Sequence, residues 1–282
     1  MVVSIGNIAC GGTGKTPFTE LFAQSIGKPV AILERGYKAK IKRKKPFIVS
    51  SADEGDEAFL LSKKIPFANV IVGRKRIVSA MFAEALPVDY ILLDDGMQHR
   101  YLHRDLEIVV LHFKDIISPP KFLPSGLLRE SPKRLKHAHA IIINGVCKQS
   151  EFEIATNYTR KFSDSPIIGV YYEIINPSQI QNKKIAVFCG IGKPEGFFFL
   201  LKSHGCELLL TKALPDHSPF QALDSFIQEA KLKKVELVCC TEKDYVKLKN
   251  SSEIIPVQVQ LKIQFGNKHY ENLVHNIKNR FV

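Results

Sequence analysis

Short runs of apolar, mostly β-branched residues recur along the first half of the chain, with helix-like stretches between them. Each run is apolar on both faces, which is typical of buried parallel strands in a sheet that helices cover on both sides. The pattern therefore predicts an α/β fold with a doubly wound, mostly parallel sheet. The runs cover residues 2–5, 30–33, 70–72, 90–93, 107–111 and 140–143.

A polar segment at residues 148–165 interrupts this pattern, which then starts again. A composition change of this kind is typical of a boundary between domains. We therefore expect a first domain at 1–150, a smaller α/β domain at 166–282 and a hinge near 145–165. In the second part, strands are expected at 167–172, 185–188, 208–210 and 235–239, and helices at 195–202, 221–230 and 268–279.

Composition and charge indicate a packed globular protein that is strongly basic. Of the 282 residues, 45% are apolar and 24% are charged, which excludes a disordered or collagen-like chain. The formal net charge of +12 favours polyanionic partners such as nucleotide phosphates, nucleic acid or an anionic membrane face. No run reaches the roughly 18 apolar residues of a spanning helix, and no signal peptide is recognisable, so we expect a cytoplasmic protein. The six cysteines form no C-x-x-C pair, and we expect neither disulfides nor a zinc site.

A glycine-rich segment follows the first predicted strand and leads into a helix that begins near Lys15. Its glycines permit a tight turn whose N–H groups point at phosphate oxygens, and the helix N-terminus adds a favourable dipole. Lys15 would reach the β- and γ-phosphates of a nucleotide, and the Thr16 hydroxyl would bind Mg²⁺. The segment matches the Walker A pattern except at Ala9, and an ordinary glycine turn is the less favoured alternative. The predicted nucleotide-binding residues are Ala9, Cys10, Gly11, Gly12, Thr13, Gly14, Lys15 and Thr16.

Two adjacent carboxylates, Asp94 and Asp95, stand at the end of the strand predicted at 90–93. A P-loop protein places the acid that holds Mg²⁺ or its water at this position, so the sequence favours a metal role over a solvated turn. The acids at 53–57 begin a helix-like stretch, where residue chemistry alone favours a capping role. The sequence therefore predicts a P-loop NTPase-type fold with a Mg²⁺ site.

Two further segments, the basic residues at 38–45 and the glycines at 189–196, do not indicate a nucleic-acid surface or a dinucleotide site. The basic segment contains no aromatic residues, which argues against a nucleic-acid surface, although it could dock on anionic lipid headgroups. The third glycine at 189–196 comes one residue late for a dinucleotide fingerprint. We interpret that segment as a strand-to-helix turn of the second domain, and we expect no nucleic-acid partner.

Taken together, these motifs resemble the tetraacyldisaccharide 4'-kinases, also called lipid A 4'-kinases. The resemblance spans nearly the whole chain, and it implies a larger P-loop domain joined by a hinge to a smaller C-terminal α/β domain. It also implies ATP and Mg²⁺ as cofactors, and transfer of the γ-phosphate to the 4'-hydroxyl of an acylated glucosamine disaccharide 1-phosphate. The matching segments are 6–7 (Gly-Asn) before the glycine loop, 35–37 (Arg-Gly-Tyr), 55–57 (Gly-Asp-Glu), 72–74 (Val-Gly-Arg) with Arg76, 94–99 (Asp-Asp-Gly-Met-Gln-His), 127–130 (Leu-Leu-Arg-Glu), 144–145 (Asn-Gly), 215–217 (Pro-Asp-His) and 241–244 (Thr-Glu-Lys-Asp).

The resemblance assigns a role to each matching residue. It makes Asp56 the general base and His217 its partner from the second domain, which reverses the capping interpretation of Asp56. Lys15 is implied to be catalytic. The implied metal-site residues are Thr16, Asp94, Asp95 and Glu130. The implied substrate-side residues are Arg35, Tyr37, Gln98, His99 and Arg129.

Membrane attachment is also expected from the resemblance. Members usually begin with an apolar, membrane-contacting helix, whereas Met1 directly precedes the first predicted strand. We therefore expect either an upstream coding segment of roughly 20 apolar residues or binding through basic residues such as those at 38–45. The expected location is the cytoplasmic face of the inner membrane, with an acylated disaccharide lipid and the anionic membrane surface as partners.

Two other function classes explain less of the sequence. A P-loop GTPase would need an Asn-Lys-x-Asp element, and the nearest segment, 241–244, has Glu242 where the lysine belongs. A non-enzymatic P-loop module that binds a membrane or nucleic acid would explain the charge and Lys15 but not Asp56, His99 and His217. Transfer of labelled phosphate to a lipid disaccharide separates these alternatives.

Overall fold

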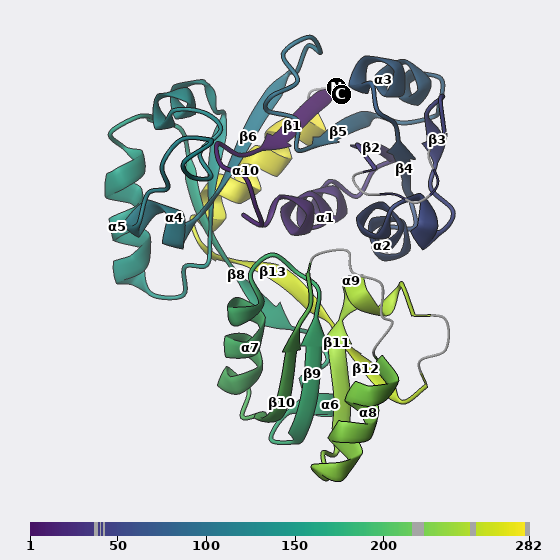
Figure 1. The fold of residues 1–282 in the computed structure, drawn as a ribbon. Helices are drawn as coiled ribbons and strands as arrows, with labels where there is room; N and C mark the ends of the chain where they lie inside the picture. The colour runs from purple at the N-terminus through teal and green to yellow at the C-terminus, as the bar shows by residue number, and fades with distance from the viewer. Residues whose placement is uncertain (37–38, 40, 42, 216–222, 249–251, 280–282) are drawn as a thin grey trace. The chain divides into compact units, whose positions relative to one another are not determined.

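The computed structural model describes the chain apart from residues 37–38, 40, 42, 216–222, 249–251 and 280–282 (Figure 1). Tyr37 and His217, two of the predicted site residues, lie outside the described residues, as does part of the basic segment 38–45. The chain divides into two units. Unit 1 contains Met1–Tyr171 and Leu261–Val282, and unit 2 contains Tyr172–Gln260.

Unit 1 is built on a nine-stranded sheet with the order β13-β8-β7-β6-β1-β5-β2-β4-β3. The six strands predicted in the first half are all present, and their neighbours pair in parallel, as expected for buried apolar runs. The sequence did not predict β3, which pairs antiparallel with β4 at one edge. The strands are β1 (Val2–Gly6), β2 (Val30–Glu34), β3 (Phe47–Ile48), β4 (Ala68–Val72), β5 (Tyr90–Asp94), β6 (Leu106–His112), β7 (Ala140–Asn144), β8 (Ile167–Ile174) and β13 (Val259–Phe265).

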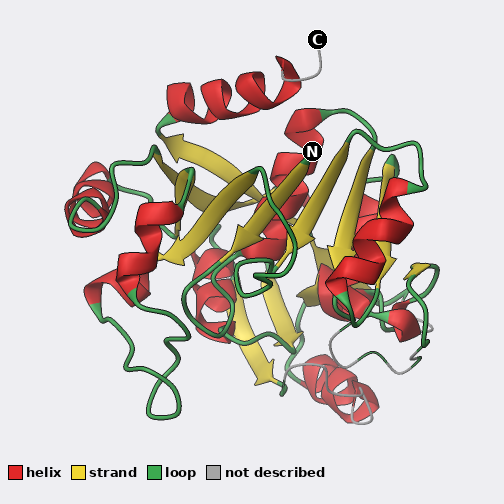
Figure 2. Cartoon of the chain, turned by 90° about the horizontal axis from the view of Figure 1, so that it is seen from above, coloured by secondary structure: helices red, strands yellow, loops and turns green. Residues whose placement is uncertain are grey.

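Helices cover both faces of this sheet, as Figure 2 shows, and alternate strand residues point to opposite faces. Ile91 and Leu93 of β5 pack against α3, whereas the Tyr90 hydroxyl donates a hydrogen bond to a carbonyl of α10 on the opposite face. A sheet covered on both sides is the doubly wound arrangement predicted from the sequence. The helices of unit 1 are α1 (Lys15–Ile26), α2 (Asp56–Lys64), α3 (Arg76–Glu84), α4 (Phe113–Ile117), α5 (Gln149–Thr159) and α10 (Asn267–Lys278), with the 3₁₀ turns η1 (Ala52–Glu54) and η2 (Pro132–His137).

Unit 2 has a four-stranded parallel sheet with the order β10-β9-β11-β12. Phe197 and Leu201 of α7 pack on one face, and Phe226 and Ala230 of α8 pack on the other. The segment at 189–196 is the β9-to-α7 turn, as predicted. The elements are α6 (Pro177–Ile180), β9 (Lys184–Cys189), α7 (Pro194–Ser203), β10 (Glu207–Ala213), α8 (Leu223–Leu232), β11 (Leu237–Thr241), α9 (Glu242–Tyr245) and β12 (Ile254–Val257).

The predicted domain boundary is wrong. The polar segment 148–165 is not a hinge, because most of it forms α5, whose Ala155 and Thr159 are buried in unit 1. Polar residues occupy the outer face of this helix, and they made it resemble a linker in the sequence. The following strand, β8, pairs in parallel with β7 and therefore extends the large sheet.

The last helix also belongs to unit 1, not to the second domain. Tyr270 of α10 packs edge-on against Phe18 of α1, with 6.3 Å between the ring centroids. Its hydroxyl donates a 2.7 Å hydrogen bond to Ser25 Oγ. The sequence missed β13, the strand that leads back to this helix, because the segment 259–265 alternates polar and apolar residues and contains no continuous apolar run.

The strand predicted at 235–239 lies two residues further along, at Leu237–Thr241. Lys234 has a φ of 53°, and the Val235 N–H bonds to the Ala230 carbonyl, so both residues close the C-terminal turn of α8. A left-handed residue at this position ends the helix in the usual way.

Tyr270 provides a test of where the last helix packs. Its side chain is 8% exposed, so Tyr270→Ala is expected to lower the free energy of unfolding by about 3 kcal/mol. Tyr270→Phe keeps the ring but removes the hydroxyl with its hydrogen bonds to Ser25 Oγ and the Leu21 carbonyl, and it should cost about 1 kcal/mol. Urea unfolding followed by circular dichroism measures both losses. An alanine variant as stable as the phenylalanine variant would show that α10 does not pack on α1.

Candidate active site

The predicted phosphate loop lies between β1 and α1 at the carboxyl end of the central strands of unit 1. Gly11 and Gly14 have φ values of 101° and 97°, a left-handed conformation that glycine adopts readily. Gly14 is the residue before the helix, so the first N–H groups of α1 are directed toward the loop. Ala9 forms a β-bridge with Leu128, and this extended backbone explains why alanine is tolerated at the first Walker A position.

Two buried amide side chains support the phosphate loop through hydrogen bonds to Thr13. Asn7 Nδ2 donates to Thr13 Oγ1, and Asn144 Nδ2 donates to the Thr13 carbonyl, both at 3.0 Å. All three residues are almost fully buried. Asn7 and Asn144 belong to matching segments in the sequence, but nothing in their spacing shows that both reach Thr13.

A second segment, 127–130, is hydrogen-bonded to the same loop. The Cys10 N–H donates to the Leu127 carbonyl at 2.6 Å, and the N–H groups of Arg129 and Glu130 both donate to the Ile8 carbonyl, at 2.8 and 3.1 Å. These contacts fix the backbone on one side of the phosphate loop. They also bring the Arg129 side chain into the site.

Lys15, Asp95 and Arg129 form one group of charges. Lys15 Nζ lies 3.5 Å from Asp95 Oδ1, and the Arg129 guanidinium donates to both carboxylate oxygens, at 2.7 and 3.2 Å. Burial alone would raise the pKa of Asp95, but the Arg129 hydrogen bonds and the two positive charges outweigh it and hold the pKa at about 2. Asp95 is therefore ionised at neutral pH.

Asp94 has a different environment at the end of β5. Its two carboxylate oxygens are buried, and neither accepts a hydrogen bond of normal geometry from the described residues. Burial raises its pKa, while the neighbouring Glu34 carboxyl, the Lys15 charge and the Thr16 hydroxyl act in the opposite direction. Carboxylate and hydroxyl oxygens are the ligands that Mg²⁺ prefers, so Thr16 and Asp94 fit this ion.

Glu34 and Arg76 adjoin Asp94 and were missed as site residues. Glu34 ends β2, and burial together with the Asp94 charge raises its pKa well above the usual range. Arg76 is buried and donates a 2.6 Å hydrogen bond to the Asp94 carbonyl. A buried carboxyl beside a strand end leaves no pattern in the sequence, so only the structure reveals it.

Glu130 and Gln98 lie beside the loop but are occupied by protein contacts. Glu130 pairs with Arg134 at 3.2 Å and with Arg100 at 3.5 Å. Gln98 Nε2 donates to Glu130 Oε1 and to the Asn7 carbonyl, both at 3.0 Å. In the part of the chain that the structure describes, no three His, Cys, Asp or Glu side chains are grouped to hold a metal ion, so the four predicted metal-site residues do not form one cluster.

Asp56 stands at the first position of α2 and is buried. Its Oδ1 accepts a 2.9 Å hydrogen bond from the Glu57 N–H, but Gly55 holds the N-cap position, so Asp56 does not cap the helix. His99 is half-buried, and burial together with the charges of Arg76 and Arg35 lowers its pKa. His99 is therefore neutral at pH 7, and Arg35 lies near it.

In unit 2, the segment 241–244 has a structural role. Asp244 is fully buried, and its carboxylate accepts hydrogen bonds from the Gly190 N–H at 2.8 Å and the Thr241 hydroxyl at 2.7 Å. Lys247 pairs with the same carboxylate at 3.1 Å. These contacts occupy the Asp244 carboxylate. It is therefore not available to bind a guanine base.

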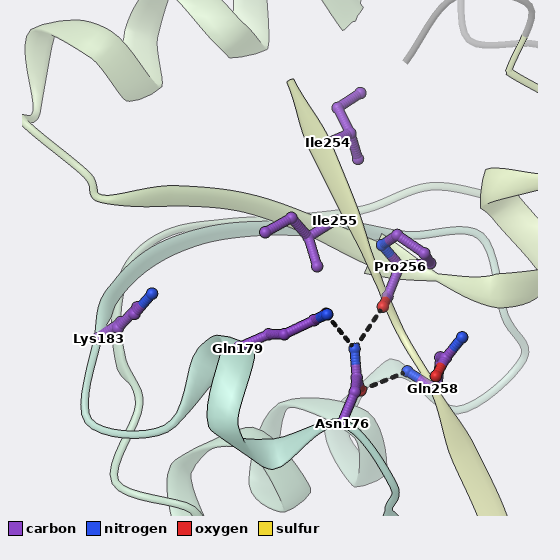
Figure 3. Close-up of a pocket in the computed structure, with 7 residues that line it drawn as sticks. All are labelled: Asn176, Gln179, Lys183, Ile254, Ile255, Pro256 and Gln258. Carbon is purple, nitrogen blue, oxygen red and sulfur yellow. Dashed lines mark hydrogen bonds between the residues drawn. The ribbon is translucent and has the colours of Figure 1, made fainter. Parts of the chain in front are cut away.

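A cavity of about 440 Å³ opens at the edge strand β12 of unit 2 (Figure 3). Asn176 lines it and donates hydrogen bonds to Gln179 Oε1 and to the Pro256 carbonyl, while the Gln258 N–H donates to Asn176 Oδ1. The Asn176 side chain therefore joins α6 to the strand edge. None of the predicted site residues lines this cavity, so it is not the candidate active site.

A strand, a glycine loop with left-handed turns and a lysine at the start of the following helix define a P-loop nucleotide-binding protein of the NTPase type. The family described as tetraacyldisaccharide-1-P 4'-kinase (LpxK) matches residues 1–279. The chain belongs to this tetraacyldisaccharide 4'-kinase family, as the resemblance in the sequence predicted.

Individual relatives agree with this assignment. The tetraacyldisaccharide 4'-kinase of Chlamydia caviae is 37% identical over 288 residues, which cover 94% of this chain and 78% of the relative. The enzyme of the same name from Desulfotalea psychrophila is 31% identical over 280 residues, covering 91% and 80%. The crystal structure of LpxK from Aquifex aeolicus in complex with ATP aligns with a TM-score of 0.74 at 29% identity, covering 98% of this chain and 88% of that one.

The low pKa of Asp95 predicts a pH dependence of stability. In the unfolded chain an aspartate has a pKa of about 3.9, so the ionised pair stabilises the fold above about pH 4. This stabilisation is lost as the pH falls toward the folded pKa of about 2. The unfolding free energy of the natural protein should therefore fall more steeply between about pH 4 and pH 2 than that of Asp95→Asn. Urea unfolding across this range measures both slopes, and equal slopes would contradict the assignment.

Proposed function

We propose that the protein is an ATP-dependent kinase that transfers the γ-phosphoryl group to the 4'-hydroxyl of an acylated glucosamine disaccharide 1-phosphate in lipid A biosynthesis. The observation that carries the proposal is the phosphate loop of unit 1, with Lys15 3.5 Å from Asp95, in a chain whose family match extends over residues 1–279. The site chemistry described below supports phosphoryl transfer in particular.

Lys15 and Arg129 supply positive charge where the triphosphate of ATP would lie. Only 14% of the Lys15 side chain is exposed, and 21% of the Arg129 side chain is. Charges shielded from water interact more strongly with a phosphoryl group, whose transfer depends mainly on positioning and charge compensation. The loop amides and the N-terminus of α1 would hold the phosphate oxygens.

Thr16 and Asp94 are the residues that would hold Mg²⁺, whereas Asp95 and Glu130, which the resemblance also implied, are paired with Arg129 and with Arg100 and Arg134. Support comes from the buried Asp94 oxygens, which accept no normal hydrogen bond from the described part of the chain. When bound, Mg²⁺ would neutralise charge on the β- and γ-phosphates. Arg76 fixes the Asp94 backbone through its 2.6 Å hydrogen bond to the Asp94 carbonyl.

Asp56 is the proposed general base that accepts the proton of the sugar hydroxyl. Asp56 begins α2, and the N–H groups at a helix start stabilise a carboxylate. His217 remains proposed as its partner on the family resemblance alone. Arg35, Tyr37, Gln98, His99 and Arg129 remain the proposed substrate-side residues, and the contacts of Gln98 with Asn7 and Glu130 also support the phosphate loop.

Peripheral attachment to the cytoplasmic face of the inner membrane is part of the proposal. The acceptor carries acyl chains, and the net charge of +12 favours an anionic lipid surface. Among the described helices, none has both the length and the apolar character needed to span a bilayer.

Lys15→Ala tests the phosphoryl-transfer proposal. Removing this cation should lower kcat by about 10²–10³-fold at saturating ATP, because a fixed charge at the transferring group contributes most in the transition state. Transfer of label from γ-labelled ATP to detergent-dispersed tetraacyldisaccharide 1-phosphate measures the loss. Lys202→Ala, an exposed lysine of unit 2, is the control and should keep normal turnover. Near-normal turnover by the Lys15 variant would refute the assignment.

Asp56→Asn tests the general base. The neutral amide cannot accept the proton, so kcat should fall by roughly 10²–10⁴-fold while ATP affinity changes little. Asp53→Asn changes an exposed acid of the same segment and should leave turnover close to normal. If the two variants lost turnover equally, Asp56 would have no special role as a base.

A further inference from the structure

An exposed apolar loop lies between α4 and η2. Phe122, Leu123 and Leu127 are 53%, 52% and 49% exposed, and Ile117 at the end of α4 is 58% exposed. Large apolar side chains that are half exposed together and rimmed by polar residues mark a surface for binding. These four residues are called the apolar loop patch below.

The backbone of this loop is folded back on itself. The Leu123 N–H donates to the Leu128 carbonyl at 3.0 Å, and the Leu128 N–H donates to the Lys121 carbonyl at 2.9 Å. A Cβ on Gly126 would collide with the Lys121 backbone, so glycine is required for this close approach. Because these internal hydrogen bonds satisfy backbone groups, the loop can enter a less polar environment at lower cost.

Basic residues surround the apolar loop patch. Residues 113–137 contain six Lys and Arg but only two acids, Asp115 and Glu130. The lysines 114, 121, 133 and 136 are all exposed. Glu130 is paired with Arg100 and Arg134, so its charge is already compensated. Apolar side chains beside exposed lysines match the interface of an anionic bilayer.

The loop is also joined directly to the catalytic machinery. Its last residues, Leu127 and Leu128, are those that bond to Cys10 and pair with Ala9 of the phosphate loop. A surface that holds this loop therefore also sets the position of the phosphate loop.

We propose that the apolar loop patch inserts into the interface of an anionic phospholipid bilayer and holds the phosphate loop next to the membrane from which the acceptor lipid is taken. The choice of a lipid partner rests on the proposed function, and the position of the patch rests on the exposure, charge and hydrogen bonds described above. Insertion buries Phe122 and Leu123, while the neighbouring lysines remain among the headgroups.

A second exposed apolar set provides a matched control. Ile77, Val78, Met81 and Phe82 form the outer face of α3 and are 46%, 42%, 64% and 37% exposed. Arg74 and Lys75 are the basic residues that flank this helix, and within the described residues its outer face makes no hydrogen bond to the phosphate loop. The chain contains no tryptophan, so a single introduced Trp is a unique fluorescent reporter.

The experiment measures co-sedimentation of the full chain with vesicles of phosphatidylglycerol and phosphatidylethanolamine, without ATP or acceptor. Phe122→Ser with Leu123→Ser should lower the partition coefficient at least about tenfold, because two half-exposed large apolar side chains lose their burial. Met81→Ser with Phe82→Ser should leave binding within about twofold. Phe122→Trp should show a blue-shifted emission on binding, and Phe82→Trp should not. Higher salt should weaken binding of the natural protein.

The proposal is overturned if the loop variant binds vesicles as well as the natural protein, if the α3 variant loses binding instead, or if the loop variant changes the oligomeric state, which would make a second copy the partner. Unchanged ATP affinity confirms that each variant is folded. The kinase assay in detergent separates this proposal from the proposed function. Loop-dependent binding without phosphoryl transfer would reject only the function, whereas transfer without loop-dependent binding would reject only the surface.

Discussion

The Ile8 carbonyl accepts hydrogen bonds from the N–H groups of Arg129 and Glu130, and the rest of the site depends on this pairing. It joins the end of the central strand β1 to the segment 127–130, which is far away in the sequence. Arg129 thereby reaches Asp95, and Asp95 in turn holds Lys15. Without this connection, Arg129 would not be held beside Asp95 and Lys15.

Fixed geometry matters because the charges are partly removed from water. Separating the partly buried Lys15 or Arg129 from Asp95 would cost free energy, so the group remains assembled before any nucleotide binds. A phosphate group entering the loop then meets cations that are already oriented, which is the condition for effective charge compensation. The buried amides of Asn7 and Asn144 serve the same purpose for the backbone of the loop.

The sequence predicted the inner strands of the large sheet because these are continuous apolar runs, and it missed the edge strands β3 and β13, which are not. It misplaced the domain boundary because α5 has a polar outer face and because α10 returns to unit 1 through β13, and neither tertiary contact leaves a local pattern. The phosphate loop was predictable because its glycines and lysine are contiguous. Glu34 and Arg76 were not predictable as neighbours of Asp94, because they approach it from two other elements of the fold. The pairing of Asp95 with Arg129 likewise depends on contact between residues far apart in the sequence.

The central claim is that the phosphate loop is held by the segment 127–130 before nucleotide binds. Hydrogen–deuterium exchange of the Cys10, Arg129 and Glu130 amides in the nucleotide-free protein tests it directly, since all three donate hydrogen bonds in this pairing. We predict exchange at least roughly 10³-fold slower than in an unstructured peptide, which corresponds to an opening free energy of about 4 kcal/mol. Exchange at the rate of an unstructured peptide, with protection appearing only after ATP is added, would contradict the claim.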